Sequence, residues 1–179
     1  MRKRAIAVVL ATAALFSAWT GQASACRGSK LPPNRQSVDQ ARRAIFCLIN
    51  HRRTHRGLKR LRGSFALLSA AQAHSDAMAA QNFFSHEGND GTPASRAEAA
   101  GYMAGASAWG LGENLEWASG KAASPRAVVD AWMGSPEHRD VMFSRRFRHI
   151  GVGVASGSPM SPDVQNAEMF TADFGFRKG

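Results

Sequence analysis

The first part of the chain carries apolar residues at the spacing of amphipathic helices. Ser37 followed by Gln40 has the form of a capping box, and apolar residues then recur every three or four positions until Gly57 can end the segment. Residues 64–81 are rich in Ala, Leu and Met with few helix breakers, which predicts a second and mostly buried helix. We expect residues 82–92 to form the loop after it.

Shorter helices are predicted further along the chain, wherever Ser or Thr precedes Pro. The hydroxyl side chain can cap the first turn, and Pro is tolerated as the first helical residue. Such pairs occur at Thr92-Pro93, Ser124-Pro125 and Ser135-Pro136. Gly101 can end the first of these helices, and apolar residues within 128–133 give the second a buried face.

The hydrophobic period changes from helical to alternating near the C-terminus. Ile150, Val152 and Val154 alternate with other residue types after His149, and apolar residues alternate again over 170–176. Residues 155–167 contain Gly, Ser, Pro and Asn, which favour a hairpin connection. Helices are predicted in the first two thirds of the chain, and the strands that pair with each other come near its C-terminal end. This order predicts an α+β or layered αβα domain rather than a parallel nucleotide-binding fold.

The N-terminal 25 residues have the three parts of a removable signal peptide. Residues 2–4 are basic, residues 5–19 are largely apolar, and residues 23–25 are the small residues that a signal peptidase recognises. The apolar run is shorter than the ~20 residues that span a bilayer. We therefore expect a secreted, extracytoplasmic protein without a transmembrane segment. Cleavage would leave Cys26 first, so a lipidated Cys26 is the alternative, although Ala stands where such signals usually carry Leu.

One domain accounts for the rest of the chain. Removing 25 of 179 residues leaves 154, and a domain of this size buries roughly 68 to 70% of its surface. We expect an N-terminal segment at 26–36 and one domain at 37–177. The signal holds three basic and no acidic residues, so the net charge falls from +10 to +7 after cleavage. The mature protein stays strongly basic.

Cys26 and Cys47 are the two cysteines of the chain. In an oxidising compartment an even pair favours a disulfide over two thiols. This bridge would tie the new N-terminus to the first helix. A reactive or metal-binding thiol lacks a CxxC or a nearby cysteine-histidine motif to support it.

Three short motifs place ionisable side chains beside Gly, Ser or Pro: FFSHEGNDGT at 83–92, GENLEWAS at 112–119 and WMGSPEHRDVM at 132–142. IGVGVA and MFTADFG follow them near the C-terminus. In this order the five motifs resemble the CAP superfamily of cysteine-rich secretory, antigen 5 and pathogenesis-related proteins, in its bacterial form. The resemblance spans residues 37–176. It implies a secreted αβα sandwich around a mainly antiparallel sheet, with a cleft lined by two histidines and two acids.

The resemblance assigns three of the four cleft positions. It implies that His86 and His138 are the two histidines and that Glu113 is the first acid. The fourth position departs from the family, because Ser135 stands three residues after the tryptophan, where many eukaryotic members carry an acid and bacterial members often carry serine. Glu137 is a neighbouring substitute, although adjacent residues of a helix point about 100 degrees apart.

The cleft residues can act in three ways. His86 and His138 can bind zinc or another divalent cation, with Glu113 either as third ligand or as hydrogen-bond partner of a ligating histidine, and with water in the open position. Alternatively Glu113 can orient one imidazole as general base while the other serves as acid. In the third case the side chains only hold three loops together.

We expect a secreted binding module more than an enzyme. The sequence has no nucleophile elbow and no HExxH pair, and one fold hosts many functions. The resemblance implies a lipid or a sterol-like molecule as ligand, and the positive charge of an exported protein adds a cell-envelope polymer. A metal-assisted hydrolase of an extracytoplasmic polymer or peptide is the second hypothesis, and an adhesion module without cleft chemistry is the third.

Other conspicuous side chains are assigned structural roles. His74 lies in the Ala-rich helix, where a single histidine is usually a packed, hydrogen-bonded residue. We expect Trp109, Trp117 and Trp132 in the core or the cleft wall, with Trp117 the one that faces a ligand. Asp90 is interpreted as a loop former, because its surroundings lack the oxygen-rich spacing of an EF-hand.

Basic residues gather in two stretches of the sequence. The first holds Arg52, Arg53, Arg56, Lys59, Arg60 and Arg62, and the second holds Arg145, Arg146 and Arg148. Cations near a helix C-terminus are partly explained by the helix dipole. Their functional interpretation is attraction to anionic envelope polymers or lipid headgroups. Nucleic acid is not expected, because the protein is exported and no aromatic residues alternate with the basic run.

Overall fold

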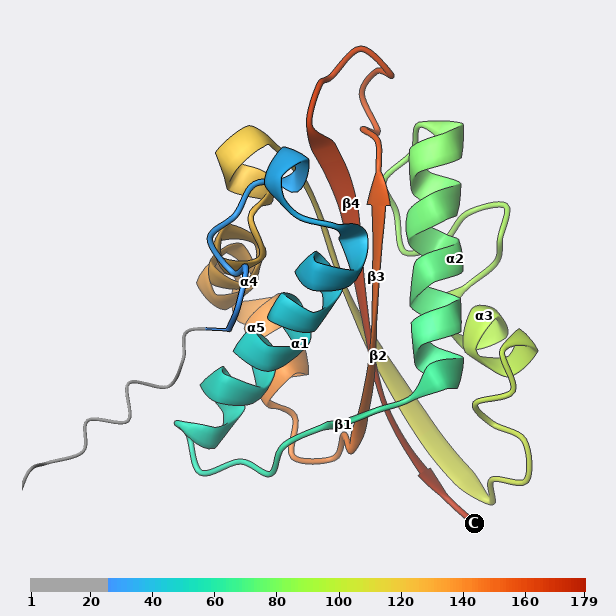
Figure 1. Cartoon of the computed structure of the whole chain (residues 1–179). Coiled ribbons are helices and arrows are strands. Elements are labelled where there is room, and N and C mark those ends of the chain that lie inside the picture. Colours follow the sequence, from blue (N-terminus) through green and yellow to red (C-terminus); the bar gives the residue numbers. More distant parts are fainter. Residues whose placement is uncertain (1–25) are drawn as a thin grey trace, which may run out of the picture.

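A computed structural model describes residues 26–179, which fold into three layers (Figure 1). Helices α1 (Val38–Thr54), α4 (Pro125–Gly134) and α5 (Pro136–Phe143) cover one face of the sheet, and α2 (Phe65–Gln81) and α3 (Pro93–Ala99) cover the other. Two short 3-10 turns, η1 (Pro33–Arg35) and η2 (Gly120–Ala123), flank the first layer. The predicted αβα sandwich is confirmed. The predicted signal peptide lies outside the described residues.

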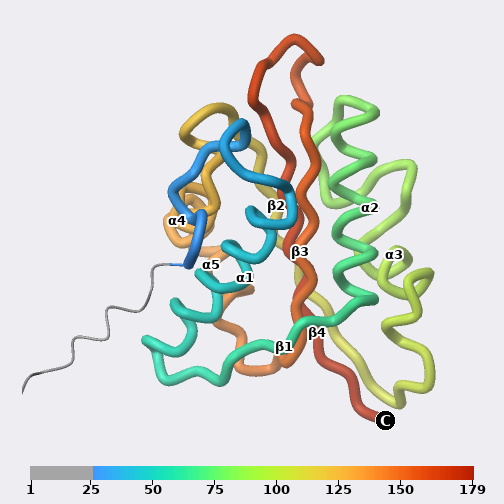
Figure 2. The backbone as a smooth tube through the Cα atoms, in the orientation of Figure 1, coloured from blue at the N-terminus to red at the C-terminus, as the bar shows by residue number. Residues whose placement is uncertain are grey.

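The sheet has four strands in the order β1-β3-β4-β2. Their bounds are β1 (Arg62–Gly63), β2 (Ala108–Ser119), β3 (His149–Ser156) and β4 (Ala167–Lys178). Strand β4 pairs antiparallel with both neighbours, and the short β1 pairs parallel with β3. Through β1, at the lower end of the view, the chain crosses from the layer of α1 to the layer of α2 (Figure 2). Strands β3 and β4 are the two that alternation predicts, whereas the long β2 is not predicted.

The two faces of β3 explain the IGVGVA motif. Ile150, Val152 and Val154 point into the main core beneath α1 and α4. Gly151 and Gly153 point the other way, where a Cβ atom on either would come within 2.1 Å of the backbone of α2. Helix α2 therefore lies directly against the sheet, and glycine is required by this close approach.

The helix boundaries follow the predicted caps. The Ser37 side chain accepts a hydrogen bond from the Gln40 amide and completes the predicted capping box, and the Ser64 side chain caps α2. Helix α1 ends at Thr54 rather than at Gly57, which instead takes a left-handed φ of 66° in the following turn. This difference of three residues leaves the basic segment after α1 as an irregular loop.

Cys26 and Cys47 form a disulfide, with their Cα atoms 5.7 Å apart. The pairing predicted from the sequence is confirmed, and it holds the N-terminal segment against α1. Among the described residues, no helix combines the length and the apolar character that crossing a membrane requires.

Candidate functional site

Strand β2 lies at one edge of the sheet and presents adjacent residues to its two faces. Glu113 is paired with Asp173 of β4 and points toward the layer of α2 and α3, while Asn114 points toward α5. The side-chain amide of Asn114 donates to the backbone carbonyl of His138 at 2.9 Å. This bond holds the first turn of α5 against β2.

His86 reaches Glu113 from the loop that follows α2. Its Nδ1 atom lies 2.7 Å from Oε1 of Glu113, and its side chain is 54% exposed while that of Glu113 is 2% exposed. The hydrogen bond to Glu113 raises the pKa of His86, and this effect outweighs burial and Arg96, which lower it. The opposite ring nitrogen, Nε2, is therefore the atom available to a ligand.

Arg96 of α3 occupies the second oxygen of Glu113. Its Nη2 atom lies 2.7 Å from Oε2 and 3.1 Å from the carbonyl oxygen of His86. Burial on its own would raise the pKa of Glu113, but the bonds and charges of His86 and Arg96 lower it overall. Glu113 is thus a buried carboxylate held ionised, with both oxygens engaged.

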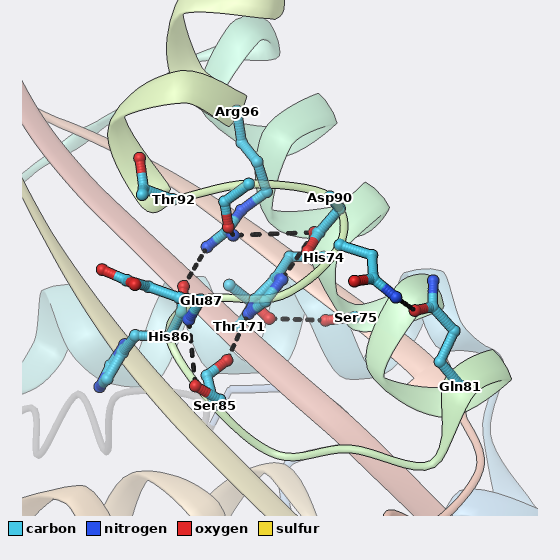
Figure 3. A network of polar contacts seen from close by, with 12 residues as sticks. His74, Ser75, Gln81, Ser85, His86, Glu87, Asp90, Thr92, Arg96 and Thr171 are labelled. Atoms are coloured by element: carbon cyan, nitrogen blue, oxygen red, sulfur yellow. Dashed lines mark hydrogen bonds and ion pairs between the residues drawn. The ribbon is translucent and has the colours of Figure 1, made fainter.

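A second set of contacts fixes the loop that carries His86 (Figure 3). His74 of α2 is fully buried, with Nδ1 2.7 Å from Oδ2 of Asp90 and Nε2 2.9 Å from the carbonyl oxygen of Ser85. Arg96 donates to the Gly91 carbonyl at 2.7 Å and lies 3.7 Å from Asp90. These contacts support the structural roles predicted for His74 and Asp90. In Figure 3 the imidazole of His86 is turned away from this network.

Asp173 lies behind Glu113 in the interior of the sheet. It is 3% exposed, and its Oδ2 atom has no hydrogen-bond partner among the described residues. Burial and the neighbouring charge of Glu113 raise the pKa of Asp173 well above its usual range. The site therefore holds two carboxyl groups whose pKa values are shifted in opposite directions, downward for Glu113 and upward for Asp173.

His138 approaches from α5, on the opposite face of the sheet from His86. Burial lowers the pKa of His138, and the charge of His86 lowers it further. The charge of Glu137 raises it, but the overall shift is downward. Ser135 caps α5, with its hydroxyl accepting from the His138 amide at 3.4 Å, and Glu137 is exposed. The structure thus joins His86 directly to Glu113, and His138 lies close enough to His86 to be affected by its charge, with Ser135 capping the helix turn that carries His138.

The three tryptophans of residues 26–179 have three different environments. Trp132 is fully buried, and its indole N–H donates to the carbonyl of Leu115. Trp117 is half-buried and packs against the cluster of Met78, Leu115 and Met169. Trp109 is 45% exposed, so it does not lie in the core, one of its two predicted places. It stands at the open start of β2, beyond the end of the packed layers.

A three-residue metal ligand set is not formed within residues 26–179, where no three His, Cys, Asp or Glu side chains group closely enough to hold an ion. The arrangement instead offers two imidazoles and an ionised carboxylate that orients one of them. Arg96 and Asp173 are the site residues that sequence reasoning did not find. In the sequence, Arg96 is marked only as an arginine within the Ala-containing segment of α3. Asp173 is marked only as an acid among the alternating apolar residues 170–176 of β4.

Comparison with known proteins identifies the fold and the family. The sequence profile described as the CAP, cysteine-rich secretory protein family matches residues 46–172. The uncharacterized protein YkwD of Bacillus subtilis is 36% identical over 124 residues, which cover 68% of this chain and 46% of that protein. The chain therefore spans less than half of the length of this relative.

Two solved structures share the architecture. An outer surface protein from Borrelia burgdorferi aligns with a TM-score of 0.65 and 19% identity, over 80% of this chain and 97% of that one. An extracellular protein containing a SCP domain from Bacillus anthracis aligns with a TM-score of 0.60 and 25% identity, over 80% and 44% of the two chains. With the family profile covering most of the sequence, the resemblance seen in the motifs is confirmed: this chain belongs to the cysteine-rich secretory protein (CAP) family.

Proposed function

We propose that the protein is an extracytoplasmic binding module whose His86 and His138 imidazoles hold a divalent cation, with zinc the best match to two nitrogen ligands. Glu113 does not touch the cation and instead orients His86. Water, or an oxygen of the bound organic ligand, completes the coordination. The expected ligands remain a lipid, a sterol-like molecule or an envelope polymer.

The contacts of Glu113 are the observation that carries this proposal. A metal-binding histidine usually donates its other ring N–H to a carboxylate, a backbone carbonyl or water, which fixes the tautomer and the ring orientation. Here Nδ1 of His86 is bound to Oε1 of Glu113, and Arg96 holds the other carboxylate oxygen. Both carboxylate oxygens have protein partners, so orienting His86 fits Glu113 better than direct ligation does.

The same contacts disfavour Glu113 itself as the general base of a hydrolase. A general base needs an oxygen or nitrogen that can take a proton from water within hydrogen-bond reach. The oxygens of Glu113 are both engaged, and its pKa is lowered overall by His86 and Arg96 despite burial. A carboxylate held in this way orients its neighbours but is a poor proton acceptor.

Calorimetric titration of zinc tests the metal proposal. Helix α1 offers a competing pair, because the Nε2 atoms of His51 and His55 lie 3.1 Å apart on its exposed side. We would therefore titrate the wild type, His86→Ala/His138→Ala and His51→Ala/His55→Ala. If the cleft binds zinc, His86→Ala/His138→Ala should lose a binding event that His51→Ala/His55→Ala retains. Equal heats in the wild type and His86→Ala/His138→Ala would contradict it.

The pH dependence and a Glu113 variant sharpen the test. Zinc competes with the proton for His86, whose pKa is raised by Glu113, so affinity must increase as the pH rises through that pKa. Glu113→Gln should weaken zinc binding by about 10- to 100-fold, as loss of a carboxylate that orients a ligating histidine typically does. Turnover of a peptide or polymer that collapses in Glu113→Gln would instead support the hydrolase.

Export is supported by two independent features. Cys26 and Cys47 are joined in a disulfide, which persists in oxidising compartments. The matched proteins from Borrelia burgdorferi and Bacillus anthracis are described as outer surface and extracellular proteins, respectively. Mass spectrometry of the protein from culture medium or envelope tests this proposal, which requires a mature chain that begins at Cys26. Recovery of the chain with residues 1–25 intact in the cytoplasm would overturn it.

A further inference from the structure

Three basic segments that are far apart in the sequence meet at one end of the molecule. Residues 55–63 follow α1, residues 144–149 precede β3, and residues 175–179 end β4. The strand register joins them, because Arg62 is paired with His149 and His149 with Gly175. In Figure 1 all three lie at the lower end of the sandwich. We call this surface the basic end.

The basic end carries a large excess of positive charge. Its exposed cations are Arg56, Lys59, Arg60, Arg62, Arg145, Arg146, Arg148, Arg177 and Lys178. The three segments hold no Asp or Glu, and none of these nine residues forms an ion pair within the described part of the chain. His149 responds to the resulting field: burial lowers its pKa, and the charges of Arg62, Arg177 and Arg148 lower it further.

Arg53 holds two of the segments in place. It is almost fully buried, and it donates to the carbonyl oxygens of Lys59 at 3.0 Å, Met142 at 2.6 Å and Ser144 at 3.2 Å. A hollow of about 240 Å³ opens above it between Lys59, Arg145 and Arg148. The cations are therefore presented by a fixed framework around a recess.

Two aromatic side chains that point into solvent border the basic end. Phe65 is 93% exposed and follows Arg62 by three residues. Trp109 is 45% exposed and is the cross-strand partner of Arg177. Exposed aromatic rings beside cations are typical of surfaces that enter the boundary between headgroups and acyl chains. A soluble polyanion would neutralise the cations but would offer the rings no apolar environment.

We propose that the basic end docks the protein on an anionic bilayer, with its cations on the lipid headgroups and Phe65 and Trp109 inserted at the interface. The surface is separate from the histidine cleft, so docking does not depend on metal binding. Binding should weaken steeply with added salt, because the contribution of the cations is screened.

Vesicle sedimentation tests the proposal with two charge variants. The purified protein should bind vesicles of phosphatidylcholine mixed with phosphatidylglycerol and should not bind phosphatidylcholine alone. Arg60→Gln/Arg62→Gln/Arg145→Gln should lower the partition coefficient by about 100-fold, at about fivefold for each cation removed. The control Arg27→Gln/Lys30→Gln/Arg35→Gln removes the same charge from the exposed N-terminal segment and should cost much less. Equal losses in the two variants would overturn the proposal.

A third variant separates a bilayer from a soluble polyanion. Phe65→Ser/Trp109→Ser keeps every cation, so it should retain binding to inorganic polyphosphate while losing most of its binding to the anionic vesicles. Vesicles should also shift the tryptophan fluorescence of the wild type to shorter wavelength, and Trp109→Phe should abolish that shift. Vesicle binding that is unchanged in Phe65→Ser/Trp109→Ser would identify the basic end as a polyanion site instead.

Discussion

Arg96 and Glu113 form an ion pair of 2.7 Å in the interior of the candidate site, with side chains that are only 3% and 2% exposed. Desolvation of two charges is expensive, so such a pair persists only when further hydrogen bonds satisfy both partners. Here His86 bonds Glu113 and the carbonyls of Gly91 and His86 accept from Arg96, whose Nε alone has no partner among the described residues. The pair thus connects α3, the His86 loop and β2 in one network.

Removing one partner of this pair should be strongly destabilising. Arg96→Met leaves Glu113 buried without its cation, and we expect the free energy of unfolding to fall by about 3 to 5 kcal/mol. Urea unfolding measures the change. The control is Arg52→Met, which breaks the exposed pair with Asp130 and should cost less than about 1 kcal/mol. Similar losses in the two variants would show that the buried pair has no special role.

His86 should titrate above its ordinary pKa of 6.5, because its hydrogen bond to Glu113 favours the imidazolium. Because the pKa is higher in the folded than in the unfolded state, the contribution of His86 to the free energy of unfolding is fully present below pH about 6.5. It is lost as the pH rises through the folded-state pKa. An NMR titration of the ring protons measures the shift. Glu113→Gln should lower the His86 pKa, because burial and Arg96 then act unopposed, while Glu116→Gln, a change at a nearby residue of β2, should leave it in place.

The sequence predicts the helices and the two C-terminal strands because each has one buried face and a clear period. Ile150, Val152 and Val154 show this for β3. Strand β2 escapes prediction because Glu113 and Asn114 put polar groups on both of its faces, where they serve the site. The local pattern is lost at the position where function requires buried polar side chains.

The site is predicted in part for a similar reason. His86, Glu113 and His138 stand in recognisable motifs, and the structure bonds His86 to Glu113 while His138 approaches from α5 on the other face of the sheet. Arg96 and Asp173 carry no motif, since their importance depends on which segment packs beside them. Trp109 shows the converse case, because its apolar ring suggests burial while its position at the sheet end leaves it exposed.

Glu168 should make stability depend on pH around neutrality. It is 3% exposed and burial raises its pKa to about 7. Because the raised pKa belongs to the folded state, the contribution of Glu168 to the free energy of unfolding is fully present below pH about 4.5. This contribution is lost as the pH rises through 7. Glu168→Gln should therefore be more stable than the wild type at pH 8 by on the order of 2 kcal/mol, and equally stable at pH 4. Thermal unfolding at the two pH values checks this, and a variant that is less stable at pH 8 would contradict it.

The contact between α2 and β3 should tolerate no side chain at Gly153. A Cβ atom there would lie 2.1 Å from the carbonyl oxygen of Ala71, a backbone atom that moves only if the whole helix shifts. Gly153→Ala should therefore lower the free energy of unfolding by about 3 kcal/mol or more. The control is Gly63→Ala in β1, where a Cβ atom meets nothing within 4 Å and the change should be close to neutral. If Gly153→Ala unfolds at the same urea concentration as Gly63→Ala, the helix does not lie against the strand as closely as described.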